Sequence, residues 1–439
     1  MDGTHFRMPL YFPAQGASET EATIIEWSVG EGDHFVKGQV LAQVDSAKSV
    51  FDFEAPCEGI AIHIFHLEGE TILLTDSVME IETSDPEMKE WIPPAVADDE
   101  TSFKRMTVPL RQPGDGDAEG AVILGIGGYL PDRVVTNAQL VERFPEITEQ
   151  YVYQVTGIRE RRWADKDERP SDMAFKASLE AIRKSGIATK EIDAVILATT
   201  TPDMAMPSTA CILQDRLSLR GVPAFDLNAA CSGWLYAVSM ARGMILSGMA
   251  RNVLTVGVDI QSRLLDKSDR NSYFIFGDGA GAAIISAGNQ GHRIRDAILG
   301  ADTRGLRMAR REHPGYFVPN GDGNIDPWIR LDGPALFRFA TDSFTAVILE
   351  ALQKTGWKVE QMRWIVPHQA NGRILRAAAR RSGVPYDRFC LNVDRVGNTS
   401  SASIPLALLE IERDLKPDDK LVLCSVGAGL TTAAISVEW

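Results

Sequence analysis

A lone cysteine stands where a predicted strand gives way to a predicted helix. In the stretch "DLNAACSGWLYAVSMARGMI", Cys231 follows a strand-like run and begins the helical part. A thiol at a helix N-terminus meets unpaired backbone N–H groups and the positive end of the helix dipole, which predicts a lowered pKa. The same N–H groups could hold an oxyanion when the thiol attacks a thioester carbonyl. The alternative is a small buried side chain, the usual state of a free cysteine, and position alone does not decide between the two.

Two further polar residues stand at comparable positions. His368 closes the predicted strand "RWIVPHQ" directly before a helix, and Asn398 precedes another helix in "RVGNTSSASIPLAL". Each has a structural alternative, a core or capping histidine in one case and an asparagine N-cap in the other. Three such groups, each at a strand end or a helix start, are less easily explained as coincidence, and together they form a Cys–His–Asn set.

A Cys–His–Asn set is compatible with two unrelated chemistries. Papain-like proteases place the histidine some 130–150 residues after the cysteine, and here the interval is 137 residues. A papain-type cysteine, however, lies near the mature N-terminus in a "CGSCW"-like motif. Cys231 instead follows about 110 residues of alternating strand and helix pattern, which argues against a protease.

The elements that must position these groups lie between residues 121 and 439. Strands such as "DAVILATTT", "NVLTVGVDI" and "KLVLCSV" alternate there with helices such as "DMAFKASLEAIRKSGI" and "SASIPLALLEIERDL". Short β-branched strands between helices predict an α/β fold with a largely parallel, buried sheet. Ligand chemistry is then expected at the carboxyl ends of the strands, which is where Cys231 and His368 fall.

The composition argues against several other classes of function. The chain of 439 residues has a net charge of -15, which disfavours a nucleic-acid partner and a basic membrane-binding face. Its five cysteines, an odd number without framework spacing, indicate a reducing cytoplasm rather than a disulfide scaffold. The sequence "MDGTHFRMPLYFPAQG" has no basic region followed by an apolar run, so no signal peptide is predicted. We expect a cytoplasmic protein without a metal site.

Residues 1–83 have a different pattern, with 15 acidic and 3 basic side chains. The segments "EWSVGEGDHFVKGQVLAQVD" and "HIFHLEGETILLTDSVMEIE" align Gly32 with Gly69 and alternate apolar positions around a glycine turn, which predicts a small all-β domain. Between them "DSAK" suits a tight hairpin turn, with Lys48 at an exposed tip. Residues 84–120, rich in Pro, Gly and charge, are predicted to be a flexible linker.

Seven stretches between residues 121 and 439 carry a family resemblance: "GIGGYLPDRVVTN", "TGIRERR", "ATTTPDMAMPSTAC", "PAFDLNAACSGW", "DRNSYFIFGDGAGAA", "VPHQANGRI" and "DRVGNTSSASIPLAL". Through these stretches, which follow the family order, residues 121–439 resemble 3-oxoacyl-[acyl-carrier-protein] synthase III, a condensing enzyme of the thiolase-like superfamily. The resemblance implies a duplicated αβαβα core, with halves at residues 121–290 and 291–439, in a homodimer.

The resemblance also implies a role for each member of the Cys–His–Asn set. Cys231 takes an acyl group from a CoA or carrier thioester, and His368 and Asn398 polarise the thioester carbonyl of malonyl-acyl-carrier protein. Decarboxylation leaves an enolate, which the two hydrogen-bond donors stabilise and which attacks the acyl-Cys231 thioester to give a 3-oxoacyl product. The backbone N–H of Ala428, in "VGAGLTT", is expected to complete an oxyanion hole with that of Cys231. The motif "FGDGAGAA" is expected to serve close backbone packing rather than nucleotide binding.

Several positions that the family uses to contact CoA differ in this chain. Tyr151 and Val155 stand where the family has a tryptophan and an arginine. Arg270, in "SDR", is a candidate phosphate contact, together with Tyr151 at the CoA site. The basic run comprises Arg159, Arg161 and Arg162, which are either further phosphate contacts, Arg159 in particular, or a solvated face.

Two other parts of the substrate site follow from the same resemblance. Met206 stands where the family places a residue from the partner subunit at the end of the acyl pocket. The usual "GGGFTWG" near the C-terminus is "GAGLTTA" here. Asn371 and Arg373, close after His368, are the expected contacts of an acyl carrier protein.

Residues 8–83 resemble the lipoyl/biotinyl carrier fold, through the stretch "MPLYFPAQGASETEATIIEWSVGEGDHFVKGQVLAQVDSAKSVFDFEAP". In that family the lysine at the hairpin tip is modified. Lys48 lies between Ala47 and Ser49, rather than between the two methionines of a biotin carrier. Lipoate on Lys48 is therefore favoured over biotin, and an unmodified docking domain is the remaining alternative.

Carrier and condensing regions in one chain motivate a hypothesis about how the acyl group arrives. A lipoyl arm on Lys48, loaded by a 2-oxoacid dehydrogenase component, would deliver the group to Cys231 as a thioester, and tethering would give an effective concentration near the millimolar range. One alternative is transfer of the acyl group from Cys231 to an alcohol or amine. Another is a non-catalytic assembly subunit that docks through the carrier domain. The presence of both His368 and Asn398 favours condensation.

Overall fold

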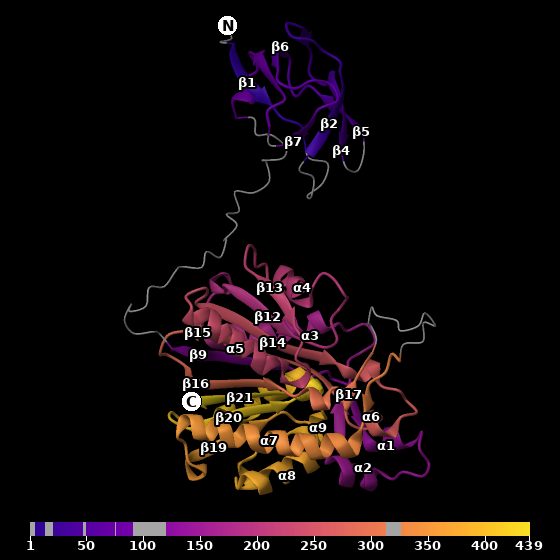
Figure 1. Cartoon of the computed structure of the whole chain (residues 1–439), viewed down its shortest axis with the longest axis vertical. Coiled ribbons are helices and arrows are strands. Elements are labelled where there is room, and N and C mark those ends of the chain that lie inside the picture. The colour runs from indigo at the N-terminus through magenta and orange to yellow at the C-terminus, as the bar shows by residue number, and fades with distance from the viewer. Residues whose placement is uncertain (1–4, 14–20, 47–49, 75, 91–119, 313–325) are drawn as a thin grey trace. The chain divides into compact units, whose positions relative to one another are not determined.

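The computed structural model describes the chain except for residues 1–4, 14–20, 47–49, 75, 91–119 and 313–325. It divides into two units, Met1–Ser102 and Phe103–Trp439, each described here by itself (Figure 1). Lys48 and most of the predicted linker lie outside the described residues, so both remain predictions. Within the described residues, no helix is both long enough and apolar enough to cross a membrane.

The first unit is a sandwich of two four-stranded antiparallel sheets. One has the order β1 (Phe6–Leu10), β8 (Met79–Thr83), β6 (Gly59–Ile64) and β3 (His34–Phe35). The other has the order β5 (Val50–Glu54), β4 (Val40–Ser46), β2 (Glu21–Trp27) and β7 (Thr71–Leu73), and a short helical turn, η1 (Pro86–Glu90), follows β8. A shared core that includes Leu10, Ile24, Val44 and Ile81 lies between the sheets. The small all-β domain is thus confirmed.

The sequence repeat of the first unit is also a structural repeat. Ile24 of β2 pairs with Val44 of β4, and Ala61 of β6 pairs with Ile81 of β8, so equivalent pairs lie 37 residues apart. Each pairing shifts register directly after the first of these residues. Because strand pairing and irregularity recur at the same interval, the alternation seen in the sequence reports two copies of one strand arrangement.

The second unit is built on a mixed sheet. Among the described residues its order is β13 (Ala224–Leu227), β12 (Ala194–Ala198), β14 (Asn252–Ile260), β15 (Asp278–Ala287), β9 (Ala121–Tyr129), β16 (His292–Ala301), β21 (Thr431–Glu438), β20 (Lys420–Val426) and β19 (Met362–Pro367). β9 and β16 pair at just two positions, which divides the sheet into two halves. Two small ribbons add β10 (Val134–Thr136) with β11 (Glu160–Arg162), and β17 (Ala309–Arg310) with β18 (Arg330–Leu331).

The prediction of a largely parallel sheet is wrong. The parallel pairs are β12–β13, β12–β14 and β19–β20, whereas the pairings from β14 through β15, β9, β16 and β21 to β20 are antiparallel. The chain returns from β20 to β21 through one short turn, η11 (Ala428–Leu430), and antiparallel neighbours need no more than that. The strands that precede Cys231 and His368, β13 and β19, do lie in parallel pairs.

Helices form three layers around the two half-sheets (Figure 1). α3 (Pro170–Ser185) and α4 (Thr209–Arg216) cover the outer face of the first half, and α7 (Gly333–Thr355) and α8 (Gly372–Ser382) cover that of the second. α5 (Gly233–Leu246) and α10 (Ser403–Ile411) lie between the halves in an apolar core. The shorter helices are α1 (Asn137–Val141), α2 (Glu149–Thr156), α6 (Arg270–Tyr273) and α9 (Val393–Val396). This arrangement confirms the thiolase-like αβαβα core.

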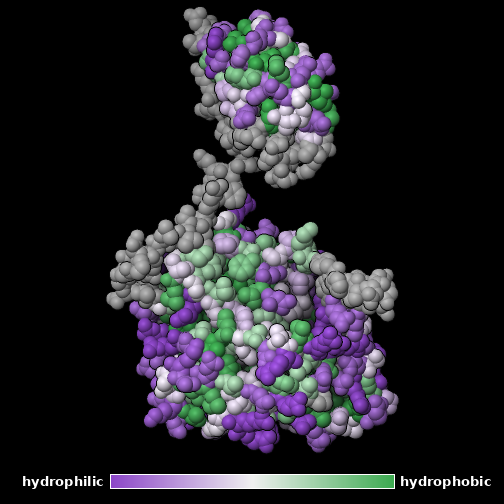
Figure 2. All heavy atoms as spheres, in the orientation of Figure 1, coloured by the Kyte–Doolittle hydropathy of each residue, from purple (hydrophilic) through white to green (hydrophobic). Residues whose placement is uncertain are grey.

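The outermost layer of the second half presents a polar surface. Hydrophilic side chains predominate over α7 and α8 in Figure 2. On α8 the exposed residues include Arg373, Arg376, Arg380 and Arg381, whereas Leu375, Ala378 and Ala379 are buried. The helix therefore places its apolar stripe against α7 and the sheet and leaves a basic stripe in solvent.

The motif "FGDGAGAA" makes a close backbone contact, as predicted. A Cβ atom on Gly277 would lie 2.1 Å from the carbonyl oxygen of Val396. The Gly277 N–H donates to the carbonyl of Asn398 at 3.0 Å, and the Asn398 N–H donates to the carbonyl of Ile275 at 3.0 Å. The glycine thus lets the segment that carries Asn398 lie directly against the start of β15.

We expect Gly277→Ala to lower the free energy of unfolding by roughly 1–3 kcal/mol, because the new methyl group meets backbone that cannot move without disturbing α9. Equilibrium urea unfolding measures the change. The control is Gly243→Ala in α5, where a Cβ atom meets nothing within 4 Å. That substitution should stabilise the protein by about 0.5–1 kcal/mol. Equal stability of Gly277→Ala and the parent protein would contradict this account of the motif.

Candidate active site

A cavity of about 1580 Å³ in the second unit has Cys231, His368 and Asn398 in its wall. Cys231 lies in the helical turn η3 (Ala230–Ser232) between β13 and α5, and His368 follows β19 directly. Asn398 precedes η9 (Ser400–Ala402), which leads into α10. Three segments that are far apart in the sequence thus bring the three side chains to one cavity.

The thiol sits on a sharply bent part of the backbone. Ala230, directly before Cys231, has a φ angle of 47°, and Ser400, whose Oγ lies 3.7 Å from Cys231 Sγ, has a φ angle of 52°. Leu430, in the turn that follows β20, has a φ angle of 48°. Left-handed conformations cost non-glycine residues of the order of 1–3 kcal/mol each and cluster at functional sites. Their concentration around Cys231 marks this part of the cavity as a site held in place by its surroundings.

Hydrogen bonds join the cysteine turn to the loop between β20 and β21. Ser425 Oγ donates to the carbonyl of Cys231 at 3.1 Å, and Thr431 Oγ1 donates to that of Ala229 at 2.9 Å. A Cβ atom on Gly427 would lie 3.0 Å from the Cys231 nitrogen, so glycine permits this approach. Ala428, the next residue, lines the cavity. The backbone N–H of Ala428, which is predicted to complete the oxyanion hole, therefore belongs to a loop that is held beside the thiol.

The prediction of a lowered thiol pKa is wrong for this structure. Burial raises the pKa of Cys231 to about 12, against the smaller lowering effect of its hydrogen bond with Ser400. The buried carboxylate of Asp259 raises it further. A charged thiolate loses its hydration in the enclosed cavity, and this desolvation raises the pKa by more than the N–H groups at the helix start lower it. The cysteine therefore rests as a neutral thiol.

His368 is also neutral, and its hydrogen bonds indicate where its proton lies. Burial lowers its pKa to about 3. Its Nδ1 lies 2.6 Å from Ser403 Oγ, and that oxygen also accepts the Gln369 N–H at 3.3 Å. We assign the Ser403 hydroxyl as the donor to Nδ1, because its proton has no other hydrogen-bond acceptor in the described part of the chain. The ring proton is then on Nε2, and the imidazole acts as a hydrogen-bond donor.

Asn398, like His368, has a hydrogen-bond donor available for a ligand, because its amide NH2 group is largely unoccupied. Its Oδ1 accepts the Ser400 N–H at 2.9 Å, while Nδ2 makes one long contact, 3.5 Å, with the carbonyl of Ala370. The side chain is buried. An amide whose oxygen is occupied has its N–H groups left for a ligand, so the cavity offers two neutral donors in His368 and Asn398.

A completely buried carboxylate holds the segments behind the thiol together. Asp259, the penultimate residue of β14, accepts hydrogen bonds at Oδ1 from the Thr200 N–H at 2.8 Å and the Thr200 hydroxyl at 2.9 Å. Its Oδ2 accepts the Ser401 hydroxyl at 2.7 Å and the Ser401 N–H at 3.1 Å. The carboxylate thus fixes η9, which carries Ser400, against the carboxyl end of β12.

Sequence reasoning missed Ser400, Ser403 and Asp259. The signal for the serines was the run "NTSSAS", which reads as ordinary helix capping because hydroxyl side chains are common there. Asp259 lies one residue before the end of a strand, close to where the predicted site residues fall, but an aspartate at that position commonly begins a turn. Their roles appear once the chain is folded, since all three act on partners far away in sequence.

Four of the predicted substrate contacts also line the cavity: Tyr151, Arg270, Asn371 and Arg373. Tyr151, Arg270 and Arg373 have exposed side chains, as contacts with a large substrate require. Asn371 uses its amide within the protein, because Oδ1 accepts the Arg373 N–H at 2.8 Å and Nδ2 donates to the Val155 carbonyl at 3.2 Å. Asn371 therefore begins α8 and ties it to α2, and its contact with a carrier protein remains a prediction.

Two other predicted contacts lie elsewhere. Arg159 is exposed outside the cavity wall, with its guanidinium 4.1 Å from the centre of the Tyr153 ring. Met206 is 84% exposed and does not line the cavity of its own chain. Their predicted roles, in CoA binding and at the acyl pocket of a partner subunit, remain predictions.

Arg161 is a structural residue rather than a phosphate contact. It is completely buried, and its guanidinium donates to Asn137 Oδ1 at 2.9 Å and to the Phe274 carbonyl at 2.6 Å. Burial lowers its pKa to about 10. The basic run is therefore neither a phosphate site nor a solvated face at this position, because its middle member ties β11 to the core.

In the first unit, β4 and β5 flank Lys48 in the sequence. Asp45, one residue before the end of β4, pairs with Val50 at the start of β5, and Lys48 itself lies outside the described residues. Within the described residues, no group of three or more His, Cys, Asp or Glu side chains is arranged to hold a metal ion.

Comparison with known proteins identifies both units. The family "3-Oxoacyl-[acyl-carrier-protein (ACP)] synthase III" matches residues 225–303, its C-terminal family matches residues 352–439, and the family "Biotin-requiring enzyme" matches residues 9–81. The beta-ketoacyl-[acyl-carrier-protein] synthase III of Staphylococcus saprophyticus is 41% identical over 320 residues, which cover 72% of this chain and 98% of that protein. The corresponding protein of Syntrophomonas wolfei is 38% identical over 322 residues, 72% of this chain and 97% of its own.

Solved structures give the same result. The synthase III of Thermus thermophilus superposes with a TM-score of 0.68 and 41% identity, covering 72% of this chain and 99% of its own. The priming beta-ketosynthase of the R1128 polyketide pathway superposes with a TM-score of 0.69 and 32% identity, covering 75% of this chain and 98% of its own.

The raised thiol pKa predicts a specific pH dependence. Below a pKa of about 12 the thiolate fraction of Cys231 grows about tenfold for each pH unit, so alkylation by iodoacetamide should accelerate from pH 7 to pH 10 without levelling off. Mass spectrometry of the modified peptide measures the rate at Cys231, and Cys231→Ser is the control for reaction at other cysteines. A plateau at or below pH 8 would instead support the lowered pKa expected from the helix start.

Proposed function

The chain belongs to the 3-oxoacyl-[acyl-carrier-protein] synthase III family, with a biotinyl/lipoyl-type domain at residues 9–81, and from this premise we propose that it condenses a thioester-borne acyl group with malonyl-acyl-carrier protein. The chain is then an acyltransferase that forms carbon–carbon bonds. One observation carries the proposal. A thiol and two neutral hydrogen-bond donors, Cys231, His368 and Asn398, line a single cavity.

In the first half-reaction the acyl group moves to the cysteine. Cys231 Sγ bonds to the carbonyl carbon of the donor thioester, the bond from that carbon to the donor sulfur breaks, and the proton of the thiol passes to the departing sulfur. The backbone N–H groups of Cys231 and Ala428 would hold the oxyanion of the tetrahedral intermediate. A neutral thiol suits this exchange, since the proton that it gives up is taken by the leaving group.

In the second half-reaction the malonyl group loses CO2. The bond between its carboxylate and the adjacent carbon breaks, and the electron pair becomes an enolate whose oxygen accepts from His368 Nε2 and Asn398 Nδ2. The enolate carbon then bonds to the acyl carbon, and the bond to Cys231 Sγ breaks. The sulfur takes a proton from solvent and returns to the neutral thiol. Both donors are uncharged and buried, so they stabilise the enolate more than they stabilise the neutral thioester.

The hydrogen bonds of His368 also bear on the alternative function, transfer of the acyl group from Cys231 to an alcohol or amine. That reaction needs a base beside the acyl-cysteine to take the proton of the incoming nucleophile. With its proton on Nε2 and Ser403 bound at Nδ1, His368 is a donor rather than a base. The arrangement favours condensation over such a transfer, and over an assembly subunit without chemistry.

Substitution of the donors should separate the two half-reactions. We expect His368→Ala and Asn398→Ala each to slow CO2 release from malonyl-acyl-carrier protein by about 100- to 1000-fold, while acylation of Cys231 by an acyl thioester changes little. Labelled CO2 and the intact mass of the acylated protein measure the two steps. Cys231→Ala is the matched control, since it should abolish the adduct. Acyl transfer to an alcohol without release of CO2 would support the alternative function.

The remaining cavity residues would bind the carriers. Arg270 and Tyr151 would contact CoA, and Arg373 would contact an acyl carrier protein, whose prosthetic phosphate is anionic. Met206, exposed in one chain, would complete the acyl pocket of a second copy in a homodimer.

We further propose that Lys48 carries lipoate. A bound lipoyl group supplies a dithiol that holds acyl groups as thioesters, so a 2-oxoacid dehydrogenase component could supply acyl groups without free acyl-CoA. Lys48 lies in the sequence between β4 and β5, which pair antiparallel. The proposal is supported by the family match at residues 9–81 and by the methionine-free surroundings of Lys48.

The intact mass of protein from its native host should exceed the calculated mass by one lipoyl group, and Lys48→Arg should remove this increment. Lys37→Arg, at an exposed lysine of the same unit, should retain it. With a decarboxylase component and a 2-oxoacid, acylation of Cys231 should fall to background in Lys48→Arg. Unchanged acylation in that variant would contradict delivery through Lys48, and a biotin-sized increment would replace lipoate with biotin.

A further inference from the structure

One arginine in the cavity wall has no part in the chemistry described so far. Arg311 lines the cavity and is half-buried, and its guanidinium has no hydrogen bond or ion pair with any residue in the described part of the chain. Its neighbour Arg310 instead pairs with Glu312 at 3.1 Å. A partly desolvated cation that faces a cavity without a partner is a binding group for an anion.

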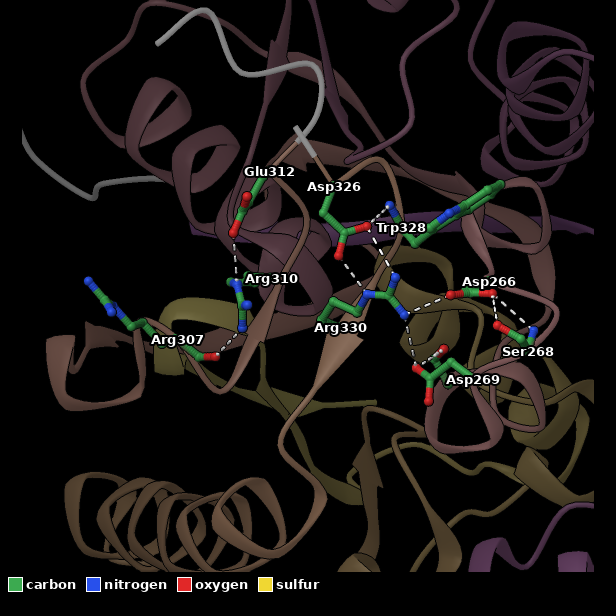
Figure 3. Close-up of polar contacts among 10 residues, drawn as sticks. Asp266, Ser268, Asp269, Arg307, Arg310, Glu312, Asp326, Trp328 and Arg330 are labelled. Atoms are coloured by element: carbon green, nitrogen blue, oxygen red, sulfur yellow. Dashed lines mark hydrogen bonds and ion pairs between the residues drawn. The ribbon is translucent and has the colours of Figure 1, made fainter. Parts of the chain in front are cut away.

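The segment that carries Arg311 is firmly held. Arg330, on the strand opposite Arg310, makes ion pairs with Asp326 at 2.6 Å and Asp266 at 2.8 Å (Figure 3). Figure 3 also shows Asp269 beside the same guanidinium, 3.9 Å away. These carboxylates hold the pKa of Arg330 above its usual value. The ribbon β17–β18, which ends one residue before Arg311, is thereby tied to the loop before α6.

The same segment packs against the loop beside the thiol. The Asp302 N–H donates to the carbonyl of Leu430 at 3.2 Å, and a Cβ atom on Gly305 would lie 2.0 Å from Leu430 Cγ. Leu430 belongs to the turn that includes Ala428, which lines the cavity next to Cys231. The residues leading into β17 therefore lie against the loop between β20 and β21, which is beside Cys231.

Electrostatics agree with this placement. Burial lowers the pKa of Arg311, and the attraction of Asp259 opposes that shift. Asp259 is completely buried and also acts on Cys231. The guanidinium is thus partly withdrawn from solvent, in agreement with the place of Arg311 in the cavity wall.

We propose that Arg311 binds a carboxylate at the far end of the acyl group carried by Cys231, so that the starter is the half-thioester of a dicarboxylic acid. The proposal rests on the proposed function and specifies its substrate class. It concerns the acyl chain, because a cation on the malonyl carboxylate would stabilise the ground state and slow decarboxylation. A phosphate of CoA or of a carrier arm lies at the opposite end of the pantetheine chain from the thioester, away from the thiol.

The proposal also constrains the reaction that supplies the starter. If the acyl group comes from a 2-oxoacid, that acid has a second carboxylate at its other end. Its oxidative decarboxylation, with the disulfide of the proposed lipoyl group as the two-electron acceptor, releases CO2 and leaves an acyl thioester with a free carboxylate. The condensation product is then a 3-oxoacyl thioester that keeps the negative charge at its far end.

The test compares chains of equal length on donors that contain no phosphate. Cys231 is acylated with N-acetylcysteamine thioesters of succinate against butyrate and of glutarate against pentanoate, and intact mass gives the rates. Arg311→Gln should slow the carboxylated member of a pair by about 10- to 100-fold and leave the uncharged member nearly unchanged. Arg311→Lys should retain part of the preference. The control is Arg307→Gln, on the same segment but outside the cavity wall, which should match the parent protein.

The proposal would be overturned by equal rates in the parent protein and Arg311→Gln, or by an equal loss for both members of each pair. It would also be overturned if, in a parallel series with CoA thioesters, the loss were confined to those donors whatever their acyl chain. A loss confined to CoA thioesters would show that Arg311 binds a phosphate of CoA instead. If no thioester of either kind acylates Cys231 in the parent protein, the proposed function itself fails. Acylation by uncharged chains alone, unaffected by Arg311→Gln, would leave the condensing function standing and remove this specificity.

Discussion

The carboxylate of Asp259 is buried at the centre of the second unit, and the geometry of the active site depends on how its charge is satisfied. A buried carboxylate is tolerated when hydrogen-bond donors surround it. Here the donors come from the turn after β12 and from the start of η9, in the two halves of the duplicated core. The charge can therefore be accommodated when both halves are in place. The hydrogen bonds of Asp259 to Ser401 fix the backbone of η9, and this places the neighbouring Ser400 beside the thiol of Cys231.

A second consequence of burial is that the resting site holds no charge on its reacting groups. The cavity raises the pKa of Cys231 and lowers that of His368. The helix start and the enclosure of the site thus act on the thiol in opposite directions, and enclosure prevails. Because Cys231 and His368 are uncharged, an enolate formed in the cavity is the principal new charge there. The N–H groups of His368 and Asn398 then act on this charge without competition from water.

Much of the site could be predicted from the sequence because strand ends are visible in it. β13 and β19 are short, apolar and followed by helices, so the positions of Cys231 and His368 follow from the pattern. β16 was missed because its exposed and buried positions alternate irregularly. The antiparallel centre of the sheet was not predicted, because the sequence pattern of a strand does not show which strand it pairs with or in which direction. Burial of a particular side chain depends on contacts between distant segments. For that reason the direction of the thiol pKa and the internal position of Arg161 could not be read in advance.

The duplicated strand arrangement of the first unit has an implication for its modification. The interval of 37 residues that relates the two copies carries the position of Lys48 onto Asp85. An attaching enzyme that recognised the paired strands alone would meet the same strand pairing twice in one domain. Asymmetry arises at the level of the side chain, since an amine can form an amide bond and a carboxylate cannot act as that nucleophile. At this position the second copy thus has no side chain that can be acylated, and the chain there continues into η1.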